Sequence, residues 1–556
     1  LDAPASQAQP SAPPRRFGEL PGPPPWPVVG NALQVTLHRM HQNMEDWVKT
    51  YGPLMQVRLA GFHVMVVADT ELIGQLLRER PQTFRRPSRM QAIMREMGIP
   101  DGVFVAEGEH WARQRRMVMA SFAPQQVRTY FPALLNVSHR LRARWLGMAQ
   151  AGQGVSGDID LQKELMRFTV DAISGLAFGV DVNTLQSNDD VIQRHLDKIF
   201  PTIWRRAHAL VPYWQVVKLP RDRALDESMR VVNEAIRDFM AQARVRLQDP
   251  ERRAAPQNLL EAMLVAADAP DSGMSDEDVA GNVFTMLLAG EDTTATSLSW
   301  MIEQLWRNPV ALARAREEVD RVLSTSAGPL PMAEWTPEHM AQLDWLEACI
   351  HESMRLKPVG PFNLVEAIKD TDVAGVPIRT GTPVLLVMRH DTVRDEVFPR
   401  AAEYLPERWL PQGEALAPSS AAMSAKRVSM PFGAGPRICI GMGFALGGIP
   451  GAVGAAVAQG QQGDTTNPSG MNAVNGMDAM SDNSVEVKFG VNEHYDFYKF
   501  RDEAADVFTY FSLQPVVKGY KDFAIEKASY FERDIAPGVH QLNNTNRGRS
   551  MALMGN

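Results

Sequence analysis

The longest regular segment of the sequence, residues 275–309, limits the fold more than any other feature. It reads SDEDVAGNVFTMLLAGEDTTATSLSWMIEQLWRNP. Ser275 and Asp278 have the spacing of a capping box, and Asn308-Pro309 ends the segment. A helix of about 34 residues with a rise of 1.5 Å per residue is roughly 50 Å long, so it must cross a whole domain. Its flanks are apolar, whereas its middle, Gly290–Thr294, is polar.

The other patterns predict a mainly α fold with a minor β part. From about Gly108 to Lys357, apolar residues recur at helical spacing between loops that contain Pro and Gly. Two short β-branched runs in Leu54–Asp69 flank Gly61 and predict a hairpin. Val373–Met388 returns to strand and turn chemistry. Apolar residues make up 45% of the chain, which is typical of a globular protein.

Composition divides the chain into four parts. Residues 1–30 are rich in Pro and Ala and predict a flexible leader, and residues 31–446 form the main domain. Residues 447–484 are rich in Gly, Asn and Ser and predict a linker. Residues 485–556 hold five of the nine tyrosines, and we expect a small α/β module there.

Charge and cysteine usage exclude several classes of protein. A net charge of −8 argues against a nucleic-acid partner. Two cysteines, Cys349 and Cys439, cannot make a disulfide framework, and without paired Cys motifs a zinc site is not expected. No apolar run reaches the roughly 18 residues that a membrane span needs. We therefore expect a soluble protein of the cytoplasm.

The stretch PFGAGPRICIG, residues 431–441, places Cys439 in nearly bare backbone beside an arginine. Small residues let backbone N–H groups approach a thiolate and moderate its charge. Phe432 could cover the sulfur, and Arg437 could meet an acidic group of a cofactor above the loop. A buried structural thiol in an ordinary turn is the alternative. Thiolate ligation of haem accounts for every residue type at once.

This stretch resembles the ligand signature of the cytochrome P-450 superfamily of haem-thiolate monooxygenases. The resemblance covers roughly residues 17–446, and it implies haem b as cofactor. It implies that Cys439 is the axial ligand of the iron and that Arg437 contacts a haem propionate. The matching positions of the signature are Phe432, Gly433, Gly435, Arg437, Cys439 and Gly441.

Two further motifs agree with this family. Glu352 and Arg355 in HESMRLKP lie three residues apart on one helix face, a spacing that is common among surface ion pairs. In YLPERWL, at the distance expected for the family, Arg408 is implied to complete a buried structural triad with them. Trp111 and Arg115 in HWARQRR have the spacing of the family's second propionate contact. Many members carry Arg or His as another such contact where this chain has Val365.

The polar middle of the long helix, AGEDTT, matches the oxygen-binding segment of the family. An acid and a hydroxyl, Asp292 and Thr293, could deliver protons within a pocket that is otherwise apolar. Ala289 and Gly290 precede them, and Gly290 is expected to permit close approach to the haem. The alternative is a helix that exposes one polar turn.

The predicted function is a monooxygenase that inserts one atom of O2 into an apolar small molecule. Residues 447–556 hold no cysteine and are too few for a reductase, so we expect a separate ferredoxin or flavoprotein electron donor. We also expect a bacterial origin. GGIPG after Leu446 should stop the helix that follows Cys439. A haem-deficient relative whose replaced C-terminus is an interaction module is therefore the alternative. A peroxide-using or isomerising member usually lacks the acid–alcohol pair, which is intact here.

Overall fold

The computed structural model describes residues 16–446 except 37–38, 60–61, 123, 152–159, 188–190, 197, 210, 327 and 412–424. The predicted linker and the predicted C-terminal module lie outside these residues, as do the first 15 residues of the predicted leader.

Helices form most of the described chain, which confirms the predicted mainly α fold with a minor β part. A π-helical turn, Ser174–Phe178, follows α6. The α-helices are α1 Met40–Tyr51, α2 Thr70–Arg78, α3 Ser88–Glu96, α4 Gly108–Ser121, α5 Pro124–Ala151, α6 Leu161–Ile173, α7 Val191–Leu196, α8 Ile199–His208, α9 Pro220–Arg246, α10 Pro250–Ala254, α11 Leu259–Ala267, α12 Asp276–Arg307, α13 Pro309–Val322, α14 Pro337–Met340, α15 Asp344–Leu356 and α16 Ala425–Ser429.

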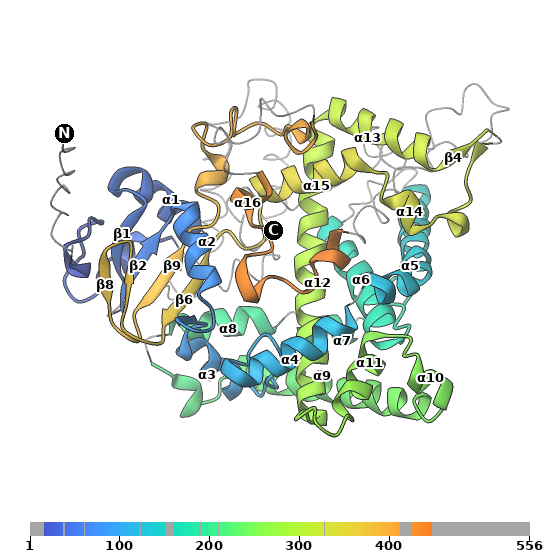
Figure 1. The fold of residues 1–556 in the computed structure, drawn as a ribbon, viewed down its shortest axis with the longest axis horizontal. Coiled ribbons are helices and arrows are strands. Elements are labelled where there is room, and N and C mark those ends of the chain that lie inside the picture. The colour runs from blue at the N-terminus through green and yellow to red at the C-terminus, as the bar shows by residue number, and fades with distance from the viewer. Residues whose placement is uncertain are drawn as a thin grey trace, which may run out of the picture.

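The predicted long helix is α12, and its ends are those the sequence predicts. The Ser275 side chain accepts a hydrogen bond from the backbone N–H of Asp278, whose carboxylate accepts from the N–H of Ser275 in return. The helix ends at Arg307, before Asn308. It runs through the middle of the helical part of the molecule (Figure 1). This position brings both of its flanks into the core.

Two hydrophobic clusters meet along α12. The N-terminal half of the helix contributes residues such as Val283 and Leu287 to one cluster, with α3, α9 and α11. The C-terminal half contributes residues such as Leu298 and Ile302 to the other cluster, with α6, α13 and α15. The polar Gly290–Thr294 segment therefore lies between two apolar regions.

The β part forms one five-stranded sheet and two small hairpins. The five-stranded sheet has the order β1-β2-β9-β6-β3, in which only the pairing of β2 with β9 is parallel. The predicted hairpin is confirmed as the antiparallel pair β1 and β2. The strands are β1 Leu54–Leu59, β2 Phe62–Val67, β3 Phe84–Arg85, β4 Ser324–Thr325, β5 Gly328–Pro329, β6 Asn363–Ala367, β7 Thr371–Val373, β8 Val376–Ile378 and β9 Pro383–Leu386.

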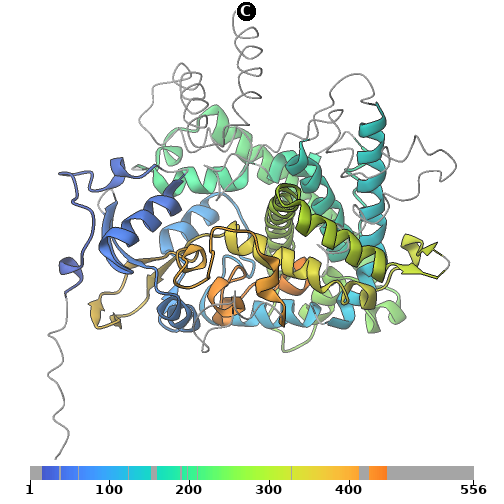
Figure 2. The ribbon, with the colours of Figure 1, turned by 90° about the horizontal axis from the view of Figure 1, so that it is seen from above.

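Alternating side chains of the five-stranded sheet bury themselves on its two faces. Val66 and its neighbour Leu385 belong to a cluster with α1, whereas Met65 and Val384 belong to another with α2. The sheet lies at one end of the molecule and most helices lie at the other, as both views show (Figures 1 and 2). The segment that carries Cys439 lies between them (Figure 1).

Residues 16–30 are not the flexible leader that their composition predicts. The side chain of Gln56 on β1 donates to the carbonyls of Gly18 and Leu20. The backbone N–H of Gln56 donates to the carbonyl of Pro21 at 2.9 Å. A Cβ on Gly22 would clash with the Gln56 carbonyl. The prolines favour an extended backbone, and this backbone lies along the edge strand β1.

Candidate active site

Cys439 lies in a tight loop, and backbone groups surround its sulfur. Its own N–H donates to the carbonyl of Phe432 at 3.0 Å, which closes the loop. The backbone N–H groups of Gly441 and Met442 donate to the thiol sulfur. The loop thus has the arrangement that its small residues predict, with N–H groups directed at the sulfur.

The thiol of Cys439 is desolvated on most sides and still reachable. Burial raises its pKa, while the two N–H groups and the positive charge of Arg115 act in the opposite direction. The residue nevertheless keeps an exposed surface. A metal ion bonded to the sulfur would share the charge of the thiolate and so offset the cost of deprotonation.

Gly435 allows the cysteine loop to pack against the end of α2. Its φ of +71° lies in the left-handed region that favours glycine. A Cβ there would clash with the carbonyl oxygen of Leu77 and lie 2.8 Å from the Cα atom of Arg78. Because both neighbours are backbone atoms, neither can move aside without moving α2.

Gly435→Ala is expected to reduce stability and haem content together. The strained φ alone costs about 1–3 kcal/mol, and the clash adds to it by pushing the cysteine loop off α2. Urea denaturation and the ratio of haem to protein measure the two effects. Gly443→Ala is the matched control, because residues 442–446 are helical and a Cβ on Gly443 meets no atom within 4 Å. Equal behaviour of the two variants would contradict the packing role of Gly435.

Arg437 is buried against the loop that precedes α4. Its guanidinium donates to the Glu107 carboxylate and to the carbonyl of Ala106, the latter at 2.9 Å, and it lies 4.3 Å from the centroid of the Trp111 ring. Burial lowers its pKa to about 10, although Glu107 acts in the opposite direction. The structure therefore brings Arg437 and Trp111 together, as the resemblance implies.

Arg115 lies one helical turn after Trp111 on α4, on the side of the cysteine loop. Burial lowers its pKa, and its charge interacts with Cys439. It also interacts with Arg437, whose pKa it helps to lower. The two arginines that the resemblance assigns to propionates thus belong to one cationic region beside the thiol.

The middle of α12 exposes the face that carries the predicted alcohol. Ala289 and Thr293 are exposed and Asp292 is partly exposed, whereas Glu291 is only 2% exposed. The Thr293 hydroxyl donates to the Ala289 carbonyl at 2.6 Å. On the packed side, the Thr169 hydroxyl of α6 donates to the Glu291 carbonyl at 3.0 Å. The acid and the alcohol therefore lie at the border between the packed and the open face.

Gly290 faces α6 and not the open side of α12. A Cβ on Gly290 would lie 3.1 Å from Cγ1 of Ile173, so the missing side chain lets α6 and α12 pack closely. Gly290 therefore has a role in helix packing, and its role in close approach to the haem stays a prediction. The sequence could not reveal this, because Ile173 is far away along the chain.

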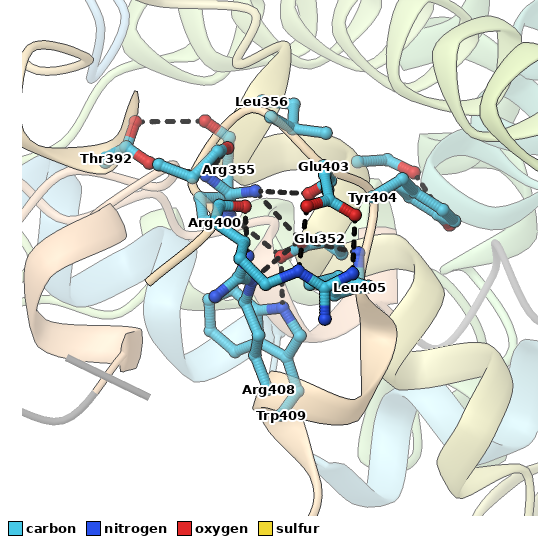
Figure 3. Close-up of polar contacts among 12 residues, drawn as sticks. Glu352, Arg355, Leu356, Thr392, Arg400, Glu403, Tyr404, Leu405, Arg408 and Trp409 are labelled. Atoms are coloured by element: carbon cyan, nitrogen blue, oxygen red, sulfur yellow. Dashed lines mark hydrogen bonds and ion pairs between the residues drawn. The ribbon is translucent and has the colours of Figure 1, made fainter. Parts of the chain in front are cut away.

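Glu352, Arg355 and Arg408 form one buried network (Figure 3). Arg355 makes two hydrogen bonds to the Glu352 carboxylate, each 2.8 Å long, and Arg408 Nε donates to the same carboxylate at 3.0 Å. The indole of Trp409 and the backbone N–H of Leu405 complete the shell at 2.9 Å. All three charged side chains have no exposed surface. The network holds α15 to the chain before the cysteine loop.

The residues around Cys439 fit a haem group. The thiol has the backbone donors that a ligating sulfur needs. Buried donors without a hydrogen-bond acceptor lie beside it, namely Nε1 of Trp111 and Nε of Arg437. Such donors are costly unless a ligand accepts from them, and haem carries two carboxylates. Cys439 would hold the iron, and Trp111, Arg115 and Arg437 would face the carboxylates.

Sequence reasoning missed several residues of this site. Glu107 pairs with Arg437 and belongs to no motif considered above, and Trp409 donates to Glu352, although YLPERWL was considered only for Arg408. Val365 is fully buried on β6 and contributes to the cluster with α2. It therefore cannot replace the basic propionate contact that many family members have there.

A cysteine loop backed by cationic residues, beside a long helix that carries an acid and an alcohol, fits the class of haem-thiolate proteins. A sequence model of the cytochrome P450 family matches residues 20–447. The chain belongs to the cytochrome P450 family, whose members bind haem b.

Curated relatives agree with this assignment. The chain is 28% identical over 454 residues to self-sufficient cytochrome P450 monooxygenase CYP505U2 of Exserohilum turcicum, covering 78% of this chain and 39% of the relative. It is 30% identical to CYP505AG1 of Oidiodendron maius and 31% identical to CYP505E4 of Penicillium expansum, each over 77% of this chain. The matched region spans 38% and 39% of these two relatives.

These relatives do not support two of the predictions. They are named self-sufficient, so the expected separate electron donor has no support from them. They come from fungi, so the expected bacterial origin has no support from them either.

Within the described ranges, no helix is both long and apolar enough to cross a membrane.

Proposed function

We propose that the chain is a haem-thiolate monooxygenase that inserts one atom of O2 into an apolar organic substrate. The observation that carries this proposal is the loop of Cys439, in which backbone N–H groups approach a reachable thiol beside buried, unpaired donors. Family membership and the names of the relatives support the reaction class. The bound haem would supply the activation of O2.

The described residues would bind the cofactor, orient the substrate and relay protons. Cys439 would hold the cofactor, and Asp292 and Thr293 would relay protons. Ile440 and Phe444, which flank Cys439, pack against the cluster that includes the N-terminal half of α12. The cysteine loop and α12 are thus held by one apolar core.

An apolar substrate is supported by two segments beside the cluster around α12. Residues 86–104, which include α3, and residues 199–214, which include α8, contribute partly buried side chains to the edge of the cluster around α12. Among these side chains are Met90, Phe104 and Phe200. They would exclude water from the reacting carbon and bind hydrocarbon by area burial.

The first test is the difference spectrum of the reduced protein with carbon monoxide. A red-shifted band typical of thiolate ligation is expected. Turnover of an apolar substrate panel with NADPH or NADH follows, with and without added redox proteins, because the relatives are named self-sufficient. A band at shorter wavelength, or no bound haem, would contradict the proposal and favour the haem-deficient alternative.

Thr293→Ala is expected to separate electron use from product formation. Without the hydroxyl, proton delivery fails, so product per electron should fall by about 10-fold or more while hydrogen peroxide rises. Thr293→Ser, which keeps the hydroxyl, is the control and should remain near the wild type. Product, peroxide and reduced nucleotide are measured in the same reaction. Unchanged coupling in Thr293→Ala would remove Thr293 from the proposed relay.

A further inference from the structure

Two arginines between α2 and α3 each have a buried Nε atom that finds no acceptor in the described chain. Arg80 is only 5% exposed, and its Nε has no hydrogen-bond partner. The Nε of Arg86 is likewise buried without a partner, and its guanidinium carbon lies 3.9 Å from the centroid of the Phe104 ring. The intervening Arg85 is different, because it forms an ion pair of 2.7 Å with Glu366.

The same region holds more positive charge than the described chain neutralises. Arg80 and Arg86 both interact with Arg437, and burial together with this repulsion lowers the pKa of Arg86 to about 9. Glu107 is the carboxylate that acts on all three arginines within the described ranges. It accepts from Arg437 and from the backbone N–H of Arg86, the latter at 3.1 Å. Three cations therefore face one anion.

Buried cations in such excess point to an anionic ligand. Keeping a guanidinium out of water is costly unless an anion accepts its hydrogen bonds. Haem b carries two carboxylates, which could accept such hydrogen bonds. The region adjoins the thiol, since Arg437 is two residues from Cys439 and Arg115 interacts with both.

We propose that Arg80 and Arg86, together with Arg437, bind the carboxylate groups of the haem. This inference rests on the haem-binding part of the proposed function. It also accounts for Val365, because the loop after α2 would provide the positive charge that β6 lacks. Glu107 would then be a positioning residue that fixes Arg437 and the backbone of Arg86 for the cofactor.

The test measures how fast haem leaves the protein. Holoprotein is mixed with excess apomyoglobin, and haem transfer is followed by absorbance. Arg80→Gln and Arg86→Gln should each lose haem about 10- to 100-fold faster than the wild type, because each removes a charged hydrogen bond. Arg78→Gln is the matched control, since this exposed arginine lies on the same segment. Wild-type rates in both test variants would overturn the inference.

A second arm replaces iron protoporphyrin IX by its dimethyl ester, in which both carboxylates are masked. If the arginines act on the carboxylates, wild type and variants should then release the ester at rates within about 2-fold of one another. Variants that still release the ester much faster would show that the arginines act through packing, which would also overturn the inference.

Spectra separate this inference from the proposed function. The thiolate band with carbon monoxide is expected in the wild type and in every arginine variant, because none of them alters Cys439. Absence of that band in the wild type would count against the proposed function. Its presence with unchanged haem release in Arg80→Gln and Arg86→Gln would count against the arginine assignment alone.

Discussion

Cys439→Ser is expected to abolish monooxygenation and the red-shifted carbon monoxide band, while the protein remains folded. Serine preserves the size of the side chain and its backbone hydrogen bonds but supplies no thiolate. Because the electron donation of the thiolate favours cleavage of the O–O bond, turnover should fall by at least about 100-fold, or about 3 kcal/mol of barrier. The measurements are the reduced difference spectrum, product formation and far-ultraviolet circular dichroism.

The second cysteine of the chain provides the control for this experiment. Cys349 is fully buried on α15, and burial raises the pKa of its thiol far above the ordinary range. Cys349→Ala should therefore keep the thiolate band and the activity per bound haem, with only a modest loss of stability. If Cys439→Ser kept the band, the ligand assignment would be wrong.

Glu352→Gln is expected to destabilise the fold by about 3–5 kcal/mol, because it leaves Arg355 and Arg408 buried without their counter-charge. Glutamine keeps the shape of the side chain, so the loss of stability measures the contribution of the negative charge. The midpoint of urea denaturation should fall, and haem content should fall with it. The measurements are circular dichroism in urea and absorbance of the purified protein.

Glu347→Gln on the same helix is the matched control for the buried network. Its side chain is 49% exposed, and it pairs with Lys426 at 3.4 Å and with His351 at 3.3 Å. An exposed pair of this kind contributes at most about 1 kcal/mol, so the midpoint should move little. Equal shifts for Glu352→Gln and Glu347→Gln would show that the network does not stabilise the fold.

Local patterns in the sequence predict much of the fold and of the site. Ser275 and Asp278 predict the start of α12, because a capping box depends on two residues that are three positions apart. The hairpin β1 and β2 and the cysteine loop are likewise short-range features. Glu352 and Arg355 belong to one helix, so their contact also follows from spacing. The link to Arg408 came from the family resemblance and not from spacing.

Contacts between distant segments could not be predicted in this way. Ile173 fills the space beside Gly290, and no local pattern relates the two residues. The prolines of residues 16–30 suggest a free leader, although hydrogen bonds from Gln56 hold this segment on β1. The unpaired Nε atoms of Arg80 and Arg86, and the excess of positive charge around Glu107 and Arg437, become evident only in the folded structure.

The parallel pairing of β2 with β9 has a consequence for how the protein is made. Met65 pairs with Val384, so β2 leaves the ribosome long before its partner strand is synthesised. Until then the hairpin presents an apolar edge, which is a site for pairing with another chain. Cys439 follows later still, so haem capture is expected to be a late event in biosynthesis. Slow translation before residue 384 would therefore favour aggregation over maturation.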